Sequence, residues 1–298
     1  MGYRDLLEMA KMRTRRLRVG VVFPDYPEVY KALKLAQSLC FDLTLIGPED
    51  TVRSWAAETG LEEYELIDAE DGQAASEKAV VLAASGGMDL LMKGSVRTAV
   101  LMKAVLHAEN GIKGDRLLSH MAVFESPDGR FIGVSDGGLN IEPTVEQKSG
   151  IIKNAIELFH YLGVPMPNIA LLSGVEVVTP GIQSTVDAGE LTEMAAAGAF
   201  PGAVVEGPVA FDLAFNPAAC RAKHYAGKIQ GNADVLIVPE IVSGNILGKT
   251  LNHAADYASG GVILGARIPI VLLSRSDRAE EKLNSLLLAA TLVDFDEY

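Results

Sequence analysis

The chain has 298 residues, of which 49% are hydrophobic, and its 26 basic and 39 acidic residues give a net charge of −13 at neutral pH. This acidic balance argues against nucleic acid as the main partner, because nucleic-acid-binding domains usually carry a basic face. No apolar run reaches the ~18–20 residues that a membrane-spanning helix needs, and Cys40 and Cys220 are too few for a disulfide framework, so a cytoplasmic protein without membrane contact is expected.

The amino-terminal third of the chain alternates strand-like and helix-like segments. We predict strands at 18–23, 43–46, 64–67 and 89–92, and helices at 28–39, 52–59, 73–85 and 98–107. Repeated strand–helix units of this kind predict a mostly parallel sheet with helices on both faces.

The middle of the chain departs from this alternation. Two apolar runs, 119–124 and 130–134, flank a Pro-Asp-Gly turn signal that ends at Gly129, which predicts a β-hairpin. A glycine pair, Gly137 and Gly138, follows the hairpin. We interpret this region as a seam between two domains.

The remaining segments return to strand–helix units. We predict strands at 169–172, 203–205, 234–238, 262–264 and 268–273, and helices at 145–162, 185–197, 217–225, 245–258 and 279–290. The fold class is therefore α/β, with two three-layer domains and mostly parallel sheets. Residues 1–139 with 280–298 would form one domain and 140–279 the other. A ligand would bind in the cleft between them, since ligands favour domain interfaces.

The most informative junction follows the predicted strand 268–273, where the chain continues as Ser274-Arg275-Ser276-Asp277. In α/β sheets, ligands bind at the carboxyl ends of the strands, and a guanidinium matches the geometry of a phosphate or carboxylate. Ser274 offers a hydroxyl donor, Arg275 an anion clamp and Asp277 a possible base.

A second candidate anion site follows the strand 89–92. A glycine turn at Gly94 leads into a helix, and Lys93, Ser95 and Arg97 stand where a phosphate would be held. An ordinary strand–helix connection with a surface lysine and arginine is the alternative.

A third candidate lies at Gly244 and Asn245, where a strand, a turn and a predicted helix start would present backbone N–H groups to an anion. Lys249 follows in a P-loop-like spacing, but Ser243 stands where that motif requires glycine. An ordinary helix N-cap is the alternative interpretation.

Two further polar positions lie at strand ends. Asp136 and Asn140 flank the glycine pair, and His120 begins a strand; all three are candidates for substrate binding. For His120, the alternative is a histidine that is simply packed and hydrogen-bonded in the strand. We predict no metal site, because no Cys/His cluster has zinc spacing. The chain also lacks a dinucleotide-binding glycine motif.

Taken together in their order along the chain, the segments described above resemble the phosphate acetyltransferase/phosphate butyryltransferase family, and they are closer to its phosphate butyryltransferase branch. The resemblance covers about residues 89–288 and depends on an ordered set of short motifs. The set comprises Leu91-Met-Lys-Gly94, Leu118-Ser-His120, Asp136-Gly-Gly-Leu-Asn-Ile141, Ile152-Lys-Asn-Ala155, Glu206-Gly-Pro208 with Asp212, Asn232-Ala-Asp234, Gly244-Asn245 with Lys249, Gly265-Ala266, Pro269 and Ser274-Arg275-Ser-Asp277.

The resemblance implies two domains of the isocitrate/isopropylmalate dehydrogenase-like fold, a homodimer, no metal and no tightly bound cofactor. It also implies reversible acyl transfer between coenzyme A and inorganic phosphate, so that acyl-CoA, phosphate and acyl phosphate are the small-molecule partners. In that family a Ser-Arg pair lies at the reacting phosphate, which corresponds here to Ser274 and Arg275. The base stays open between Asp277 and Glu281, and Lys93, Ser95 and Asn245 would hold further phosphates.

Three other functions stay open from the residues themselves. They are a metal- and NAD-dependent dehydrogenase of the β-decarboxylating type, a P-loop kinase, and a non-catalytic protein that binds coenzyme A or acyl phosphate.

Overall fold

The computed structural model describes residues 1–272 and 274–293, and its chain divides into two compact units. The first unit comprises Gly2–Arg116 together with the chain from Ser259 onward. The second unit comprises Met1 and Leu117–Ala258. No helix in these described ranges is long and apolar enough to cross a membrane.

The sheet of the first unit has the strand order β3-β2-β1-β4-β11-β10. All neighbouring pairs are parallel except β10 with β11, which is antiparallel. The strands are β1 (Leu17–Val22), β2 (Phe41–Gly47), β3 (Glu65–Asp68), β4 (Leu90–Lys93), β10 (Ala258–Leu264) and β11 (Ile270–Val271).

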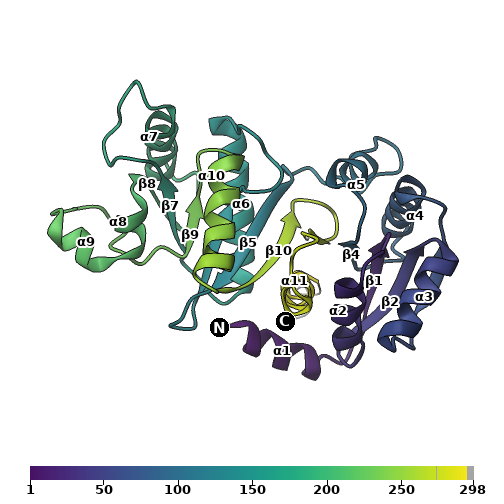
Figure 1. The fold of residues 1–298 in the computed structure, drawn as a ribbon. Helices are drawn as coiled ribbons and strands as arrows, with labels where there is room; N and C mark the ends of the chain where they lie inside the picture. Colours follow the sequence, from purple (N-terminus) through teal and green to yellow (C-terminus); the bar gives the residue numbers. More distant parts are fainter. Residues whose placement is uncertain (273, 294–298) are drawn as a thin grey trace. The chain divides into compact units, whose positions relative to one another are not determined.

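Helices cover both faces of this sheet. In Figure 1, α4 and α5 lie above the strands, whereas α2 lies below them, and α2 packs against α3 and α11. The chain moves outward from β1 to β3 and then returns to β4, and right-handed crossovers in opposite directions place their helices on opposite faces. The helices are α1 (Tyr3–Met12), α2 (Pro27–Gln37), α3 (Glu49–Thr59), α4 (Gly72–Ala84), α5 (Thr98–Val105) and α11 (Ala279–Thr291).

The sheet of the second unit has the order β5-β6-β9-β7-β8. The predicted hairpin is present as the antiparallel pair β5–β6, and the other pairs are parallel. A buried apolar cluster around Phe124, Ile132, Leu213 and Leu236 packs between this sheet and its helices. The strands are β5 (Ser119–Glu125), β6 (Phe131–Ser135), β7 (Asn168–Leu172), β8 (Val204–Val209) and β9 (Val235–Ile237).

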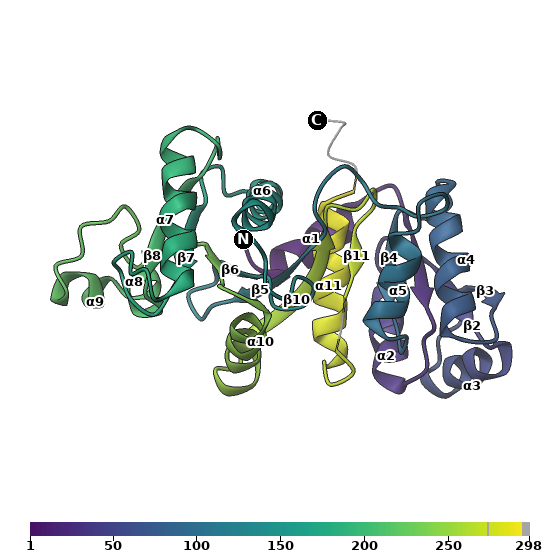
Figure 2. The same cartoon turned by 90° about the horizontal axis from the view of Figure 1, so that it is seen from above.

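The helices of the second unit again lie on both faces. Figure 2 shows α6 and α7 above the strands and α10 below them, and α6 contacts β5, β6 and β9. They are α6 (Val145–Tyr161), α7 (Gln183–Ala196), α8 (Phe211–Phe215), α9 (Pro217–Ala222) and α10 (Ile241–Lys249), which continues as a π-helical turn, Thr250–Ala254. The predicted class, two three-layer α/β bodies with mostly parallel sheets, is therefore confirmed.

The chain passes from one compact unit to the other after Arg116 and again after Ala258. The sequence suggests boundaries after residues 139 and 279 instead. The hairpin groups with the later strands because β6 pairs with β9. The Ser274–Asp277 segment groups with the first 116 residues because β11 pairs with β4. The end of the strand predicted at 268–273 lies outside the described residues.

One helix start differs from the sequence prediction in a way that affects the candidate site. The helix predicted at 245–258 begins at Ile241, and β10 already starts at Ala258. Glu240 is the N-cap, and its carboxylate accepts the N–H groups of Val242 (2.7 Å) and Ser243 (2.8 Å). Because Ser, Thr, Asp and Asn are the usual N-caps, the sequence pointed to the Ser-Gly-Asn segment instead.

Asp89 anchors the amino end of β4. Its carboxylate accepts the backbone N–H of Arg18 at 2.8 Å, the Arg18 guanidinium at 2.7 Å and the Arg15 guanidinium at 2.8 Å. Burial opposes the charged carboxylate, but the hydrogen bonds from Arg18 and the charges of Arg18 and Arg15 outweigh it, so the pKa of Asp89 lies below its ordinary value. Arg15 and Arg18 therefore serve the fold.

We predict that Asp89→Asn lowers the free energy of unfolding by about 1–3 kcal/mol, because charge-assisted hydrogen bonds to both arginines are lost. A lowered pKa stabilises the fold above the unfolded-state value and loses that contribution as the pH falls through the folded-state value. Denaturant unfolding should therefore show a deficit at pH 7 that shrinks in acid, with unchanged catalytic rates. An equal deficit at pH 7 and pH 3 would contradict this role.

Candidate active site

The parallel pairing of β4 with β11 brings two of the predicted anion sites to one edge of the first unit. Ile270 lies beside Leu91 and Val271 beside Met92, so both strands point the same way. The loops that follow them therefore leave the sheet at the same edge, where ligands bind in α/β folds.

The loop after β4 continues along the end of β1. The Gly94 N–H donates to the Val22 carbonyl and the Ser95 N–H donates to the Phe23 carbonyl, both at 2.8 Å. A Cβ atom at position 94 would lie 2.5 Å from the Phe23 carbonyl oxygen, so only glycine allows this close approach. Gly94 thus shapes the loop and is buried within it.

Arg275 joins the two loops. Its Nη2 atom donates to the Ser95 carbonyl at 2.9 Å, across 180 residues of sequence. Arg275 is exposed, and this bond uses one of its five N–H donors, so the rest of the fork is available to an anion. The structure therefore brings Lys93, Ser95 and Arg275 together at one edge of the first unit.

Lys93 is buried beneath this loop, with 6% of its surface exposed. Its ammonium donates to the carbonyls of Gly94 (3.0 Å) and Val96 (3.1 Å). Burial, and then the nearby positive charge of Arg275, lower the pKa of Lys93 to about 8. Lys93 is thus a buried cation satisfied by main-chain oxygens, rather than the surface lysine of an ordinary connection.

The Ser274–Asp277 segment forms a tight turn. The Asp277 carboxylate accepts the Ser274 N–H at 2.7 Å, and the hydroxyls of Ser274 and Ser276 lie 2.9 Å apart. Ser274, Arg275 and Ser276 are exposed, whereas Asp277 is half-buried. The turn presents its hydroxyl, guanidinium and carboxylate within four residues.

Glu281, the alternative base, has a different environment. It is 5% exposed, and its carboxylate accepts the backbone N–H of Arg278 at 2.6 Å as part of a capping box at the start of α11. A carboxylate in this position satisfies a helix terminus. The geometry favours Asp277 over Glu281 for contact with a ligand.

Lys282 is a residue of this site that the sequence analysis missed. It is fully buried, and its ammonium donates to the Ser274 carbonyl at 3.1 Å and to the Asp277 carbonyl. The available signal was a lysine on the face of the last helix that also carries Leu286. A charged residue on a buried face needs a partner.

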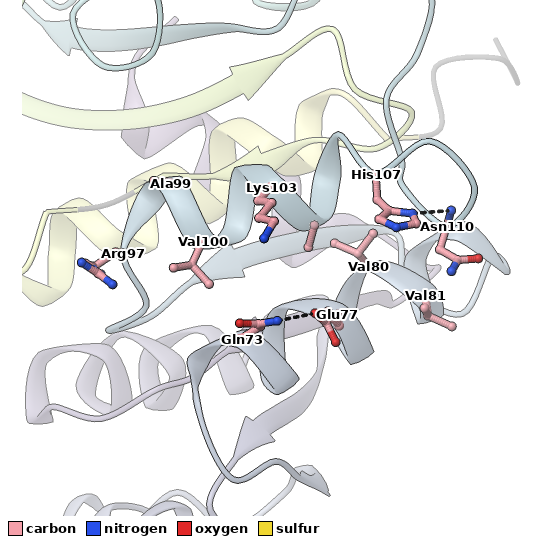
Figure 3. Close-up of a pocket in the computed structure, with 11 residues that line it drawn as sticks. Gln73, Glu77, Val80, Val81, Arg97, Ala99, Val100, Lys103, His107 and Asn110 are labelled. Carbon is pink, nitrogen blue, oxygen red and sulfur yellow. Dashed lines mark hydrogen bonds between the residues drawn. The ribbon is translucent and has the colours of Figure 1, made fainter.

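Arg97 leaves the loop in another direction. It is exposed and lines one end of a groove of about 650 Å³ between α4 and α5 (Figure 3). Val80, Val100 and Lys103 also line this groove, and at its wall Gln73 donates to Glu77 at 3.0 Å. Arg97 thus borders a surface on which apolar side chains mix with charged ones of both signs.

In the second unit, Asp136 organises its own loop. The buried carboxylate accepts the N–H groups of His120 (2.9 Å), Gly138 (2.9 Å) and Leu139 (2.8 Å), and the Asn140 amide at 2.6 Å. These four hydrogen bonds occupy both oxygens. Asp136 and Asn140 therefore hold the loop in shape.

The same loop packs closely on α10. A Cβ atom at Gly137 would lie 2.8 Å from the Gly244 carbonyl carbon, so both glycines permit a backbone contact. The Asn245 amide donates to the Gly137 carbonyl at 3.4 Å. The structure thus brings His120, Asp136, Asn140, Gly244 and Asn245 together.

The prediction that Gly244 and Asn245 start a helix is wrong. Both lie inside α10, and Glu240 already occupies the N–H groups at its terminus. Lys249 is exposed in the last turn, eight residues after the first and so about 12 Å along the axis. The P-loop interpretation therefore fails on geometry as well as on sequence.

The fold and the site define an α/β protein that presents a cationic strand edge suited to a small phosphate-like anion. The chain belongs to the phosphate acetyl/butaryl transferase family, whose sequence model matches residues 46–290.

Two named relatives agree with this assignment. A phosphate acetyltransferase of Rickettsia felis is 39% identical over 283 residues, which cover 92% of this chain and 80% of the relative. A phosphate butyryltransferase of Clostridium acetobutylicum is 33% identical over 292 residues, which cover 97% of both chains.

Solved structures show the same architecture. A branched-chain phosphotransacylase from Enterococcus faecalis V583 has a TM-score of 0.84 at 33% identity and covers 93% of this chain and 99% of its own. A 4-hydroxythreonine-4-phosphate dehydrogenase from Klebsiella pneumoniae has a TM-score of 0.53 at 14% identity, with coverage of 93% and 99%. The second likeness is one of fold alone, and it confirms the dehydrogenase-like architecture.

We predict that Lys93 makes anion binding weaken as the pH rises through about 8, because its ammonium then loses the proton that attracts the anion. Sulfate, whose charge does not change in this range, would be titrated by thermal shift from pH 6.5 to 9.5. Lys93→Met should bind sulfate more weakly and without this pH step, whereas Lys103→Met, in the neighbouring groove, should retain it. A wild-type affinity that is flat across pH 8 would contradict the prediction.

Proposed function

We propose that this enzyme catalyses the reversible transfer of a short acyl group between coenzyme A and inorganic phosphate. Acyl-CoA and phosphate give acyl phosphate and free CoA, and the reverse reaction regenerates them. The named relatives transfer acetyl or butyryl groups, and membership of the family supports the same chemistry here.

The observation that carries the proposal is the hydrogen bond from Arg275 to the Ser95 carbonyl, with Lys93 buried below the same loop. In a chain of net charge −13, this edge gathers cations whose charge is left to a ligand. A phosphate-sized anion matches both the planar guanidinium fork and the local positive field.

The proposed step is a direct displacement at the acyl carbon. Asp277 takes the proton of the CoA thiol, whose ordinary pKa of about 8.5 leaves it mostly protonated near neutral pH. The thiolate forms the new C–S bond, the C–O bond to the phosphate breaks, and Arg275 neutralises the departing phosphate. Ser274 donates a hydrogen bond to the developing oxyanion, and one such donor is worth roughly 3–4 kcal/mol.

The other site residues divide by their contacts. We propose that Lys93, Ser95 and Arg97 hold the phosphates of the substrates at the edge of the first unit. In the second unit, Asn245 is exposed and is the side chain we assign to substrate contact. Asp136, Asn140, His120 and Gly244 would maintain the loop behind it.

The whole proposal is tested by CoA release from acetyl-, butyryl- and branched-chain acyl-CoA with added phosphate. We expect phosphate-dependent release with no requirement for NAD. We also propose that the enzyme works as a homodimer in the cytoplasm. Ligand binding without turnover would favour the non-catalytic alternative.

We predict that Arg275→Ala lowers kcat/KM by about 10²–10³-fold with little change in stability, because an exposed donor to the reacting phosphate is lost. Arg275→Lys keeps the charge but loses the planar fork, so its activity should fall between the two. Steady-state kinetics and thermal unfolding measure both effects. A kcat/KM of Arg275→Ala equal to that of the wild type would show that Arg275 does not act at the reacting phosphate.

We predict that Asp277→Asn lowers the rate of CoA attack on acyl phosphate by about 10²–10⁴-fold at pH 7, as expected for loss of a general base. The deficit should shrink above pH 8.5, where the thiolate forms without help. Glu281→Gln should instead lower stability by about 1 kcal/mol through the weakened cap, with near-normal rates. The reverse pattern would make Glu281 the base.

A further inference from the structure

Lys282 is the most completely buried cation of the first unit that the mechanism above does not use. Its side chain is fully buried on α11. Burial lowers the pKa of Lys282, while the carboxylates of Asp277, Glu281 and Glu28 oppose this shift. Because taking an ammonium out of water is costly unless its donors are satisfied, the contacts of Lys282 indicate what its burial achieves.

Those contacts lie at the two ends of the reactive turn. The ammonium donates to the carbonyl of Ser274, the first residue of the turn, at 3.1 Å, and to the carbonyl of Asp277, the last. Within the turn, the Ser274 N–H donates to the Asp277 carboxylate and the hydroxyls of Ser274 and Ser276 lie 2.9 Å apart, while Arg275 reaches the Ser95 carbonyl. Lys282 therefore connects the main chain of the turn to a buried helix.

Tyr26 supports the ammonium from another loop. The Lys282 Nζ lies 5.3 Å from the centre of the Tyr26 ring, within the range of a cation–π contact. Within residues 1–272 and 274–293, the buried Tyr26 hydroxyl has no hydrogen-bond partner, so the contact described between Tyr26 and Lys282 is the one made by the ring. Tyr26 caps α2 and precedes the segment, 46–290, that the family model matches.

We propose that Lys282, seated on the ring of Tyr26, is a positioning residue that fixes the Ser274–Asp277 turn and so sets where its hydroxyl, guanidinium and carboxylate meet the substrates. The proposal rests on the function proposed for that turn. A displacement of about 1 Å in a reacting group can cost about 10²-fold in rate. Two carbonyl contacts from one rigid helix prevent such a displacement.

Hydrogen exchange tests the clamp without relying on catalysis. In Lys282→Met, amide exchange should become faster in the peptide that spans the turn, because the Ser274 N–H is no longer held against the Asp277 carboxylate. The strands β1 and β4 should keep their protection. Unchanged exchange in the turn, or faster exchange throughout the first unit, would overturn the proposal.

Kinetics then distinguish positioning from a purely structural role. Measured well below the unfolding temperature, Lys282→Met should lose about 10²-fold in kcat/KM. Adding Lys282→Met to Arg275→Ala should cost much less than adding it to wild type, because both changes act through one turn. Fully additive effects would overturn the proposal.

Matched variants come from the same chain. Tyr26→Phe keeps the ring and should retain wild-type rates, whereas Tyr26→Leu removes the ring, keeps Lys282, and should shift rate and exchange in the direction of Lys282→Met. Tyr26→Leu also keeps the proposal testable if the Lys282→Met protein does not fold. Equal rates for the Phe and Leu variants would overturn the part assigned to the ring.

A second control uses another buried lysine. Lys148 donates to Asp187 at 2.6 Å in the second unit, and Lys148→Met should lower stability without coupling to Arg275→Ala. If the wild-type enzyme shows no acyl transfer, the proposed function fails, and the exchange experiment alone decides the role of Lys282.

Discussion

The parallel pairing of β11 with β4 is the constraint on which the candidate site depends. It sets two residues of β11 beside Leu91 and Met92, and the loops that follow must then leave the sheet together. The bond from Arg275 to the Ser95 carbonyl is a consequence of this register. Because side chains alternate along a strand, a shift by one residue would turn the strand's side chains to the opposite face.

Two buried lysines beside the candidate site donate to uncharged main-chain partners. Lys93 and Lys282 are both buried, and both donate to main-chain carbonyls. A carbonyl satisfies the donor without cancelling the charge, so the field at the strand edge stays positive for an anion. Lys148 shows the contrast, since Asp187 neutralises it and that pair serves the packing of α6 on α7.

The second unit shows how a polar motif can serve shape. Asp136 spends both oxygens on the N–H groups and the amide of its own loop, and Gly137 and Gly244 let that loop lie against α10. Glu240 closes the terminus of α10 in the same way. These groups are satisfied by the protein, whereas Asn245 of the same cluster is exposed.

The sequence by itself determined the α/β class, the hairpin and the exits at Lys93 and Arg275, because apolar periodicity and turn residues act over a few neighbouring positions. It misplaced the start of α10, where an unusual glutamate cap outcompeted a Ser-Gly-Asn segment. It also missed Lys282 and Tyr26, whose meaning lies in partners far along the chain. Only the tertiary structure decided that the loops after β4 and β11 meet and that Lys282 holds the Ser274–Asp277 turn. Strand order and burial depend on contacts between residues that local patterns do not connect.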